Sequence, residues 1–189
     1  MTDLSDVLRS VCRLLDEMQV EYAVMGGIAV RAYGLPRATY DVDFTAALSP
    51  DELETFFGRC EALGFTVAPQ YRTGWVDRVA GMPLVKVRLY LQHEGIDVDV
   101  FLVELPFQRE VIHRRRKEEV DGQMVWLTTP EDLILLKLIA ARPRDALDVA
   151  DVFFMQGRLD IVYMRHWAKL LGVEAKLEKA LADASSQSA

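Results

Sequence analysis

Apolar and polar positions along the first part of the chain repeat with the period of helices in some stretches and of strands in others. Between residues 3 and 18, apolar residues recur every three or four positions, which predicts an amphipathic helix. A short apolar strand over 22–25 follows, and a glycine pair then opens a helix over 26–33. The chain therefore begins with helices and strands that alternate.

The middle of the chain is richer in strands. The pattern predicts, in chain order, a strand over 40–46, a helix from Pro50 to Leu63, strands over 84–91 and 96–103 joined by a turn at His93–Gly95, a helix over 106–115, and a strand pair around Asp121–Gly122. Ser49 and Glu52 mark the start of the first of these helices as its N-cap and its reciprocal acidic residue. Together these elements predict an α/β (α+β) fold.

The last third of the chain is helical in pattern. The first helix begins at Pro130, with Thr129 as its N-cap. Breaks at Arg142–Pro143, Gly157 and Gly172 then divide the region into four predicted helices. We expect three parts: a core over 1–128, a helical region over 129–184 packed on that core, and a disordered tail over 185–189.

Composition narrows the class of protein. The chain has 189 residues, 51% of them hydrophobic, so it can bury a substantial core. A net charge of −7 argues against broad, non-specific nucleic-acid binding. Cys12 and Cys60 are far apart and lack metal-ligand spacing, so we expect two buried thiols. No apolar run reaches the length of a membrane span and the N-terminus is acidic, so we expect a cytoplasmic protein without a membrane partner.

The first candidate site combines a glycine pair with a pair of aspartates. Gly26 and Gly27 stand at a predicted helix start, where free N–H groups and the helix dipole favour an anion such as phosphate. Asp41 and Asp43 lie two apart on a predicted strand, so their carboxylates share one face about 6 to 7 Å apart at Cα. Such a pair repels itself unless a cation lies between, and oxygen ligands suit Mg²⁺. The spacing predicts a metal and nucleotide site.

A second aspartate pair lies on a later strand. Asp97 and Asp99 alternate with Ile96, Val98 and Val100, so the strand buries its apolar face and presents both acids on the other. If this strand lies beside residues 40–46, three or four carboxylates converge, which is unstable without a divalent metal. The alternative is a solvated strand face that carries two acids.

These motifs resemble the DNA polymerase β-type nucleotidyltransferase superfamily, and within it the small stand-alone bacterial enzymes of the abortive-infection toxin type. The resemblance covers roughly residues 20–152 and is carried by Gly26–Gly27, Arg37-x-Thr39-x-Asp41-x-Asp43, the strand at Asp99, and the run from Thr129 through Lys137 to Asp148. It implies a small mixed sheet flanked by helices, Mg²⁺ dependence, an NTP donor and transfer of a nucleotidyl group. The departure is Gly27, where most members carry a serine that helps to hold the terminal phosphates.

On this basis the resemblance assigns Asp41, Asp43 and Asp99 as catalytic residues and metal ligands, with Asp99 as the general base because two large apolar residues follow it. Asp97 stands beside it as a spare acid. The expected nucleotide-binding residues are Gly26, Gly27, Arg37, Thr39 and Lys137. The planar fork of Arg37 suits phosphate, although a surface loop arginine is the alternative.

Lys137 is the only charge within an otherwise apolar helical run. It either reaches the phosphates or the carboxylates, or packs its stem while its ammonium reaches water. Asp145 and Asp148 could hold this lysine or contact the acceptor, but the default expectation is that they complement a helix dipole. The basic run 114–117 could receive a polyanionic acceptor, although charge runs at helix ends are usually solvated.

The main hypothesis is therefore a Mg²⁺-dependent nucleotidyltransferase that uses an NTP. The acceptor is open among a tRNA 3′ end, a protein hydroxyl and a small molecule such as an aminoglycoside, since fold does not choose among them. A toxin role with an antitoxin partner follows from the resemblance alone. Two rival hypotheses are a catalytically silent nucleotide-binding or partner-binding module, and a protein in which the acids only stabilise a surface.

Overall fold

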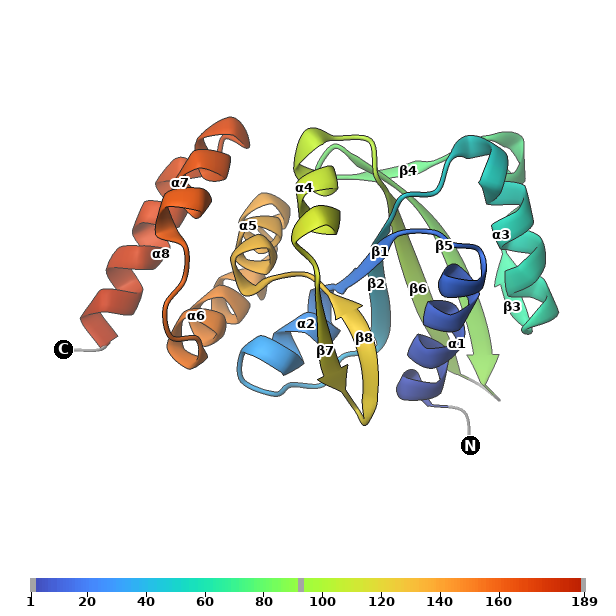
Figure 1. Ribbon diagram of the computed structural model, residues 1–189, viewed down its shortest axis with the longest axis horizontal. Helices are drawn as coiled ribbons and strands as arrows, with labels where there is room; N and C mark the ends of the chain where they lie inside the picture. The colour runs from blue at the N-terminus through green and yellow to red at the C-terminus, as the bar shows by residue number, and fades with distance from the viewer. Residues whose placement is uncertain (1–2, 92–93, 188–189) are drawn as a thin grey trace.

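A computed structural model describes residues 3–91 and 94–187 of the chain. The elements are α1 (Leu4–Glu17), β1 (Tyr22–Met25), α2 (Gly26–Tyr33), β2 (Asp41–Ala46), α3 (Pro50–Ala62), β3 (Phe65–Val67), the 3-10 helix η1 (Pro69–Thr73), β4 (Asp77–Val79), β5 (Met82–Leu91), β6 (Glu94–Leu102), α4 (Pro106–Arg114), β7 (Arg116–Val120), β8 (Gln123–Leu127), α5 (Pro130–Ala140), α6 (Asp145–Met155), α7 (Ile161–Leu170) and α8 (Glu174–Gln187). Figure 1 shows α6, α7 and α8 gathered at one end of the molecule, with α1 and α3 at the other end.

The strands form one mixed sheet in the order β3-β5-β6-β2-β1-β8-β7, and β4 pairs with β5. β2 lies between β1, to which it is antiparallel, and β6, to which it is parallel. β5 continues the sheet on the far side of β6 in the antiparallel sense. This mixed sheet with flanking helices confirms the predicted fold class, and it brings the two predicted aspartate strands side by side.

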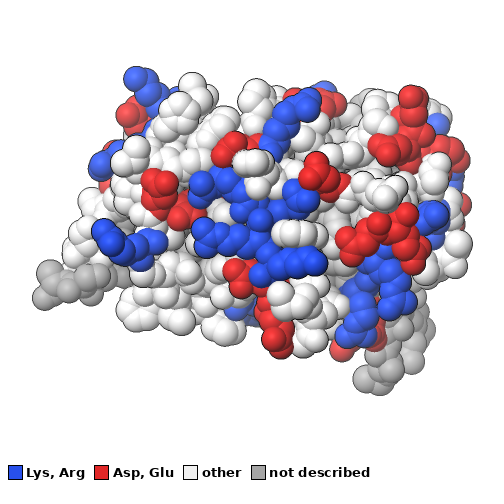
Figure 2. Space-filling model, in the orientation of Figure 1, with Lys and Arg blue, Asp and Glu red and all other residues white. Residues whose placement is uncertain are grey.

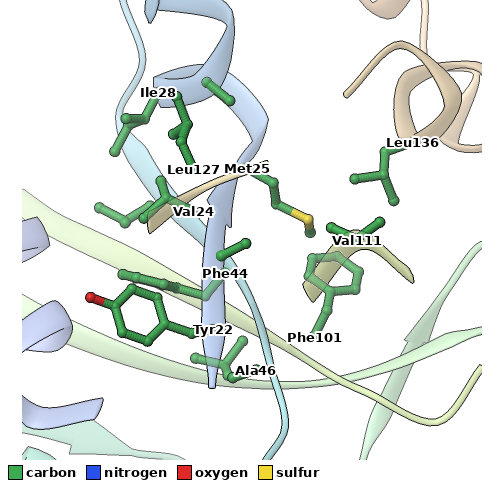
Figure 3. Packing of buried hydrophobic residues seen from close by; sticks show 14 of the residues in the cluster. Tyr22, Val24, Met25, Ile28, Phe44, Ala46, Phe101, Val111, Leu127 and Leu136 are labelled. Carbon is green, nitrogen blue, oxygen red and sulfur yellow. The ribbon is translucent and has the colours of Figure 1, made fainter. Parts of the chain in front are cut away.

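A continuous apolar core joins the sheet to the helices. Figure 3 shows Tyr22 and Phe44 from the central strands close together, and their rings meet edge to face with centroids 5.8 Å apart. α5 is buried on nearly all sides and packs against α2 and α6, which explains its almost unbroken apolar sequence. Because apolar residues of both parts belong to this one core, the expected boundary at residue 128 stays a prediction.

Most of the predicted elements are present. Glu52 accepts hydrogen bonds from the backbone N–H and the hydroxyl of Ser49, at 2.8 and 2.7 Å, as its place at the start of α3 predicts. Four helices follow Thr129, as expected. The two cysteines are buried and free, which confirms the prediction made for them.

Three predictions need correction or completion. The predicted turn at His93–Gly95 falls partly on residues 92–93, which lie outside the described residues, while Gly95 belongs to β6 and pairs with Tyr90. The predicted tail from Ser185 is helical as far as Gln187, where the hydroxyls of Ser185 and Ser186 donate to carbonyls four residues earlier. The short elements β3, η1 and β4 were missed, since segments of three to five residues carry no measurable period.

Candidate functional site

The register of β2 and β6 places the four predicted aspartates in two adjacent pairs. Asp41 is the sheet partner of Asp97, and Asp43 is the sheet partner of Asp99. In a parallel pair, partners in register present their side chains on the same face, so both pairs share one side of the sheet. The two sequence segments therefore meet, which is the arrangement on which the metal hypothesis depends.

Asp43 lies against the beginning of α2. Gly26 has a φ of +64°, and a Cβ built there would be 1.8 Å from Oδ2 of Asp43, so only glycine fits this position. Burial, together with the negative charges of Asp41 and Asp99, raises the pKa of Asp43 to about 7. Asp43 is thus a carboxylate under electrostatic strain beside the N-terminus of a helix.

Gly27 and Thr39 are also packed together. A Cβ at Gly27 would be 2.2 Å from Oγ1 of Thr39, and that hydroxyl donates a hydrogen bond of 2.8 Å to Oδ1 of Asp41. The Thr39 hydroxyl thus occupies the space that a larger residue at position 27 would need. This contact gives a structural reason for glycine where the resemblance leads one to expect serine.

Each aspartate of β6 is also bound by a cation from β5. Lys86 donates to both carboxylate oxygens of Asp99, at 2.8 and 2.6 Å, and Arg88 donates to both oxygens of Asp97. The hydrogen bond from Arg88 lowers the pKa of Asp97. Burial instead raises the pKa of Asp99, although Lys86 opposes this. Sequence analysis did not find these two partners, yet their alternation on the strand 84–91 was a usable signal.

Lys137 belongs to a separate ionic cluster, which we call the lysine cluster and which consists of Lys137, Asp145, Asp148, Arg37 and Arg142. Lys137 is 5% exposed, and its Nζ lies 3.0 Å from Asp145 Oδ1 and 2.7 Å from Asp148 Oδ2. Arg37 donates to both oxygens of Asp148, at 2.7 and 2.8 Å, and Arg142 donates to Asp145. The default expectation for Asp145 and Asp148 was therefore incomplete: both stand in the first turn of α6, but both hold the buried lysine.

Electrostatics in the lysine cluster run opposite to those of the paired aspartates. Burial would raise the pKa of Asp148, but hydrogen bonds from Arg37 and Lys137 outweigh it, so the pKa lies below its ordinary value. The pKa of Asp145 is lowered in the same way by Arg142 and Lys137. These acids are fully charged and neutralised within the fold.

Two cavities surround the paired aspartates. The larger, of 540 Å³, is lined by predicted site residues and by others, namely Gly27, Arg37, Thr39, Asp41, Asp43, Lys137, Arg142 and Arg144. The second, of 290 Å³, is lined by Gly26, Asp41, Asp43, Asp99 and Lys86, among others. Arg142 borders both cavities, although at the sequence level its segment served only as a helix break and as part of the run that carries the family resemblance. The predicted nucleotide-binding residues therefore border the same space as the predicted metal ligands.

The basic run 114–117 is largely engaged with the protein itself. Figure 2 shows Lys and Arg side chains concentrated where α4 runs into β7. Arg114 lies over the Tyr163 ring at 3.7 Å and within 3.4 Å of buried Asp132, while Arg115 bonds Glu21 and stacks near Trp126. Half of this run is therefore bound by the fold rather than solvated.

Sequence comparison decides the family. Residues 4–169 match the family described as "Nucleotidyl transferase of unknown function (DUF2204)". The chain belongs to this nucleotidyltransferase family. A sequence search of curated proteins finds no match.

Solved structures agree at the level of the fold. An antigenic nucleotidyltransferase-like protein from Paracoccidioides brasiliensis is 22% identical with a TM-score of 0.54, and the alignment covers 93% of this chain and 91% of that one. The antibiotic-resistance factor ANT(2'')-Ia is 16% identical with a TM-score of 0.52, and 98% of each chain is covered. Among the described residues, no helix is both long and apolar enough to cross a membrane.

The family implies a divalent metal, and the donor set of this site fits one only in part. Oxygen ligands that repel each other suit Mg²⁺, and the raised pKa of Asp43 shows that its charge lacks compensation. Yet within residues 3–91 and 94–187, no three His, Cys, Asp or Glu side chains converge closely enough to hold a metal ion. Asp99 is already bound by Lys86, which leaves Asp41 and Asp43 as the available pair.

Proposed function

We propose that this chain is a Mg²⁺-dependent nucleotidyltransferase that moves an NMP group from an NTP to an acceptor hydroxyl and releases pyrophosphate. Membership of a nucleotidyltransferase family supports the reaction class. The observation that carries the proposal for this chain is the pairing of Asp43 with Asp99 in register, beside the glycine start of α2 and around one pair of cavities. This arrangement supports a proposed anion site at the start of α2 beside the carboxylate of Asp43, which has no ion pair among the described residues.

The proposed roles follow from charge and position. The N–H groups at the start of α2 bind the triphosphate, while Asp41 and Asp43 hold a Mg²⁺ ion that would neutralise phosphate charge. Arg37, Arg142 and Lys137 line the larger cavity and add positive charge where the triphosphate would lie.

The chemical step is an in-line displacement at the α-phosphorus. Asp99 accepts the proton of the acceptor hydroxyl, the acceptor oxygen forms a bond to the α-phosphorus, and the bond from that phosphorus to the oxygen bridging to the β-phosphate breaks. Pyrophosphate leaves with the electron pair of the broken bond. Positioning and charge neutralisation provide most of the rate.

The test follows the α-phosphate. The chain is incubated with Mg²⁺, NTPs labelled at the α- or γ-phosphate, and total tRNA, cell protein or an aminoglycoside as acceptor. We expect label to reach one acceptor only from the α-position, with pyrophosphate release and complete inhibition by EDTA. Asp41→Asn and Asp43→Asn should each reduce release about 10³-fold. Asp183→Asn, a change at an exposed position of α8, is the matched control and should keep the wild-type rate.

An unchanged rate in Asp43→Asn would refute the assignment. The second candidate function is a silent nucleotide-binding module, which the engagement of Asp99 by Lys86 favours. It predicts NTP binding, measured by calorimetry, without any pyrophosphate release from any of these acceptors.

The resemblance to abortive-infection enzymes extends the proposal to a toxin role in the cytoplasm, neutralised by an antitoxin protein. Induced expression should then arrest bacterial growth, and Asp43→Asn should abolish the arrest. Growth that continues despite measurable nucleotidyl transfer would separate the toxin role from the enzyme.

A further inference from the structure

Lys86 stands at one end of a row of charges that crosses three strands. β6 has β2 on one side and β5 on the other, and the register runs from Asp43 through Asp99 to Lys86. A second row, two residues away on each strand, runs from Asp41 through Asp97 to Arg88. Each β6 aspartate therefore has a carboxylate on one side and a cation on the other.

We propose that Lys86 is a built-in counter-ion that withholds Asp99 from the metal pocket, so that the resting protein binds a single divalent cation at Asp41 and Asp43. Asp99 becomes a ligand for a second cation only when Lys86 releases it. This inference rests on the proposed function, since it assigns a metal pocket to the same carboxylates. It makes Lys86 a positioning residue, which acts through Asp99.

The charge balance supports one ion rather than two. Asp41, Asp43 and Asp99 carry three negative charges when ionised, and Lys86 cancels one of them at 2.6 Å. The remaining two match one divalent cation. Without the ammonium, the same three carboxylates would carry a charge that a second cation is needed to balance, and Asp99 would have both oxygens free.

The geometry distinguishes Lys86 from Arg88. Lys86 borders the 290 Å³ cavity together with Asp41, Asp43 and Asp99, whereas Arg88 borders a different groove. The two cations are exposed to a similar extent, 42% for Lys86 and 47% for Arg88, so the difference lies in their head groups: Lys86 is a point charge on a flexible stem and can leave at low cost. Arg88 holds Asp97 through a two-pronged contact, which fixes both partners.

Lys86 shares a second groove with another carboxylate, which could bind it after release from Asp99. It borders a 430 Å³ groove on its other side, and that groove is lined by Asp77 as well. The Asp77 carboxylate accepts hydrogen bonds from Tyr71, at 2.6 Å, and from Trp75, at 3.1 Å, so it is held in place. Hydrogen bonds from these two residues lower the pKa of Asp77, and the Lys86 charge adds to this. Asp77 is therefore an ionised alternative partner for the released ammonium.

The experiment counts bound Mn²⁺ by equilibrium dialysis, with electron paramagnetic resonance to detect a coupled pair of ions. The wild-type chain should bind one ion, and Lys86→Met should bind two, with the second at least about tenfold tighter than any second ion in the wild type. Arg88→Met removes the same charge two residues along β5, on the same face of the sheet. It is the matched control and should bind one ion. The double variant Lys86→Met/Asp99→Asn should return to one.

The outcomes separate this inference from the proposed function. Equal Mn²⁺ counts in the wild type and Lys86→Met, with binding still lost in Asp43→Asn, would overturn the role of Lys86 alone. A second ion in Arg88→Met but not in Lys86→Met would overturn it in favour of Asp97. A wild-type chain with neither Mn²⁺ binding nor pyrophosphate release would overturn the proposed function and the counter-ion role together. Thermal unfolding in EDTA verifies that each variant is folded, and Lys86→Gln provides a second removal of the charge.

Discussion

Two regions of this molecule each contain a pair of buried or half-buried aspartates, and the charges that surround those aspartates differ between the two regions. In the lysine cluster, Asp145 and Asp148 are 3% and 1% exposed, and each contacts an ammonium and a guanidinium. At the β2–β6 ladder, Asp43 instead faces two other carboxylates. The lysine cluster holds α5 and α6 together, whereas Lys86 and Arg88 neutralise only the two aspartates of β6 and leave Asp43 without an ion pair among the described residues.

The difference distinguishes acids that the fold itself pairs with cations from an acid that could bind an external cation. Asp145 and Asp148 each bind a lysine and an arginine, and these cations lower the pKa of both carboxyls. Asp43 forms no ion pair among the described residues, and burial together with two nearby carboxylates raises its pKa, so an external cation would stabilise its charge. The two regions meet at the larger cavity, which Lys137 and Asp43 both line. The cluster can therefore position the walls of the larger cavity while its two aspartates take no part in the proposed metal site.

The largest effect should come from breaking the lysine cluster. Lys137→Met keeps the apolar stem but leaves Asp145 and Asp148 buried with only the two arginines as partners, so we expect a loss of about 3 kcal/mol in the free energy of unfolding. Urea denaturation measures this loss. Lys179→Met, at an exposed position of α8, is the matched control and should change stability by less than about 0.5 kcal/mol. A loss below about 1 kcal/mol in Lys137→Met would contradict a stabilising role for the ammonium.

A smaller loss of stability should follow from overpacking the contact between Gly27 and Thr39. Gly27→Ala places a Cβ against Thr39, and overpacking of this kind costs about 2 kcal/mol. In a double-mutant cycle, Thr39→Gly should relieve most of that loss, so the double variant should be less destabilised than the two single changes added together. Gly58→Ala, in the middle of α3 with nothing within 4 Å, should instead stabilise the chain slightly. Simple additivity of Gly27→Ala and Thr39→Gly would show that the contact is not the cause.

The smallest expected effect gives the most specific test, because the contributions of the two regions to the free energy of unfolding should change with pH in opposite directions. The pKa of Asp43 is raised in the folded state to about 7, so its stabilising contribution is present below its ordinary value of 3.8 and is lost as the pH rises towards 7. The full change in pKa from 3.8 to about 7 would correspond to about 4 kcal/mol. Because Asp43 lines two open cavities, where solvent screens its charge, we expect the stability of Asp43→Asn relative to the wild type in EDTA to rise by on the order of 1 kcal/mol over this window.

Asp148 provides the opposite sign. Its pKa is lowered in the folded state, so its contribution is present above the ordinary value of 3.8 and is lost as the pH falls through the folded pKa. The stability advantage of the wild type over Asp148→Asn should thus shrink only in acid, as followed by unfolding with urea at each pH. A gap between Asp43→Asn and the wild type that stays constant from pH 4 to 7 would contradict the proposed strain at the ladder.

Sequence reasoning predicted the elements and the candidate acids because both have local signals. Alternation on 40–46 and 96–103 was enough to place each aspartate pair on one strand face. The partner of Asp99 comes from another strand, so the contact of Lys86 with Asp99 follows from register rather than from spacing. The contact of Lys137 with Asp148 was one of two alternatives at the sequence level, and packing decides between them. The roles of Arg37 and Lys137 towards a nucleotide stay predictions, since in this structure both bind Asp148.

The parallel pairing of β2 with β6 has a consequence for how the protein is made. The two strands are separated by α3 and by the strands that follow it, and the pairing from Asp41–Asp97 to Ala46–Leu102 closes only when all of that chain is present. Loop closure over such a distance comes late in folding. A nascent chain from which residue 102 has not yet left the ribosome therefore cannot complete the pairing of β2 with β6.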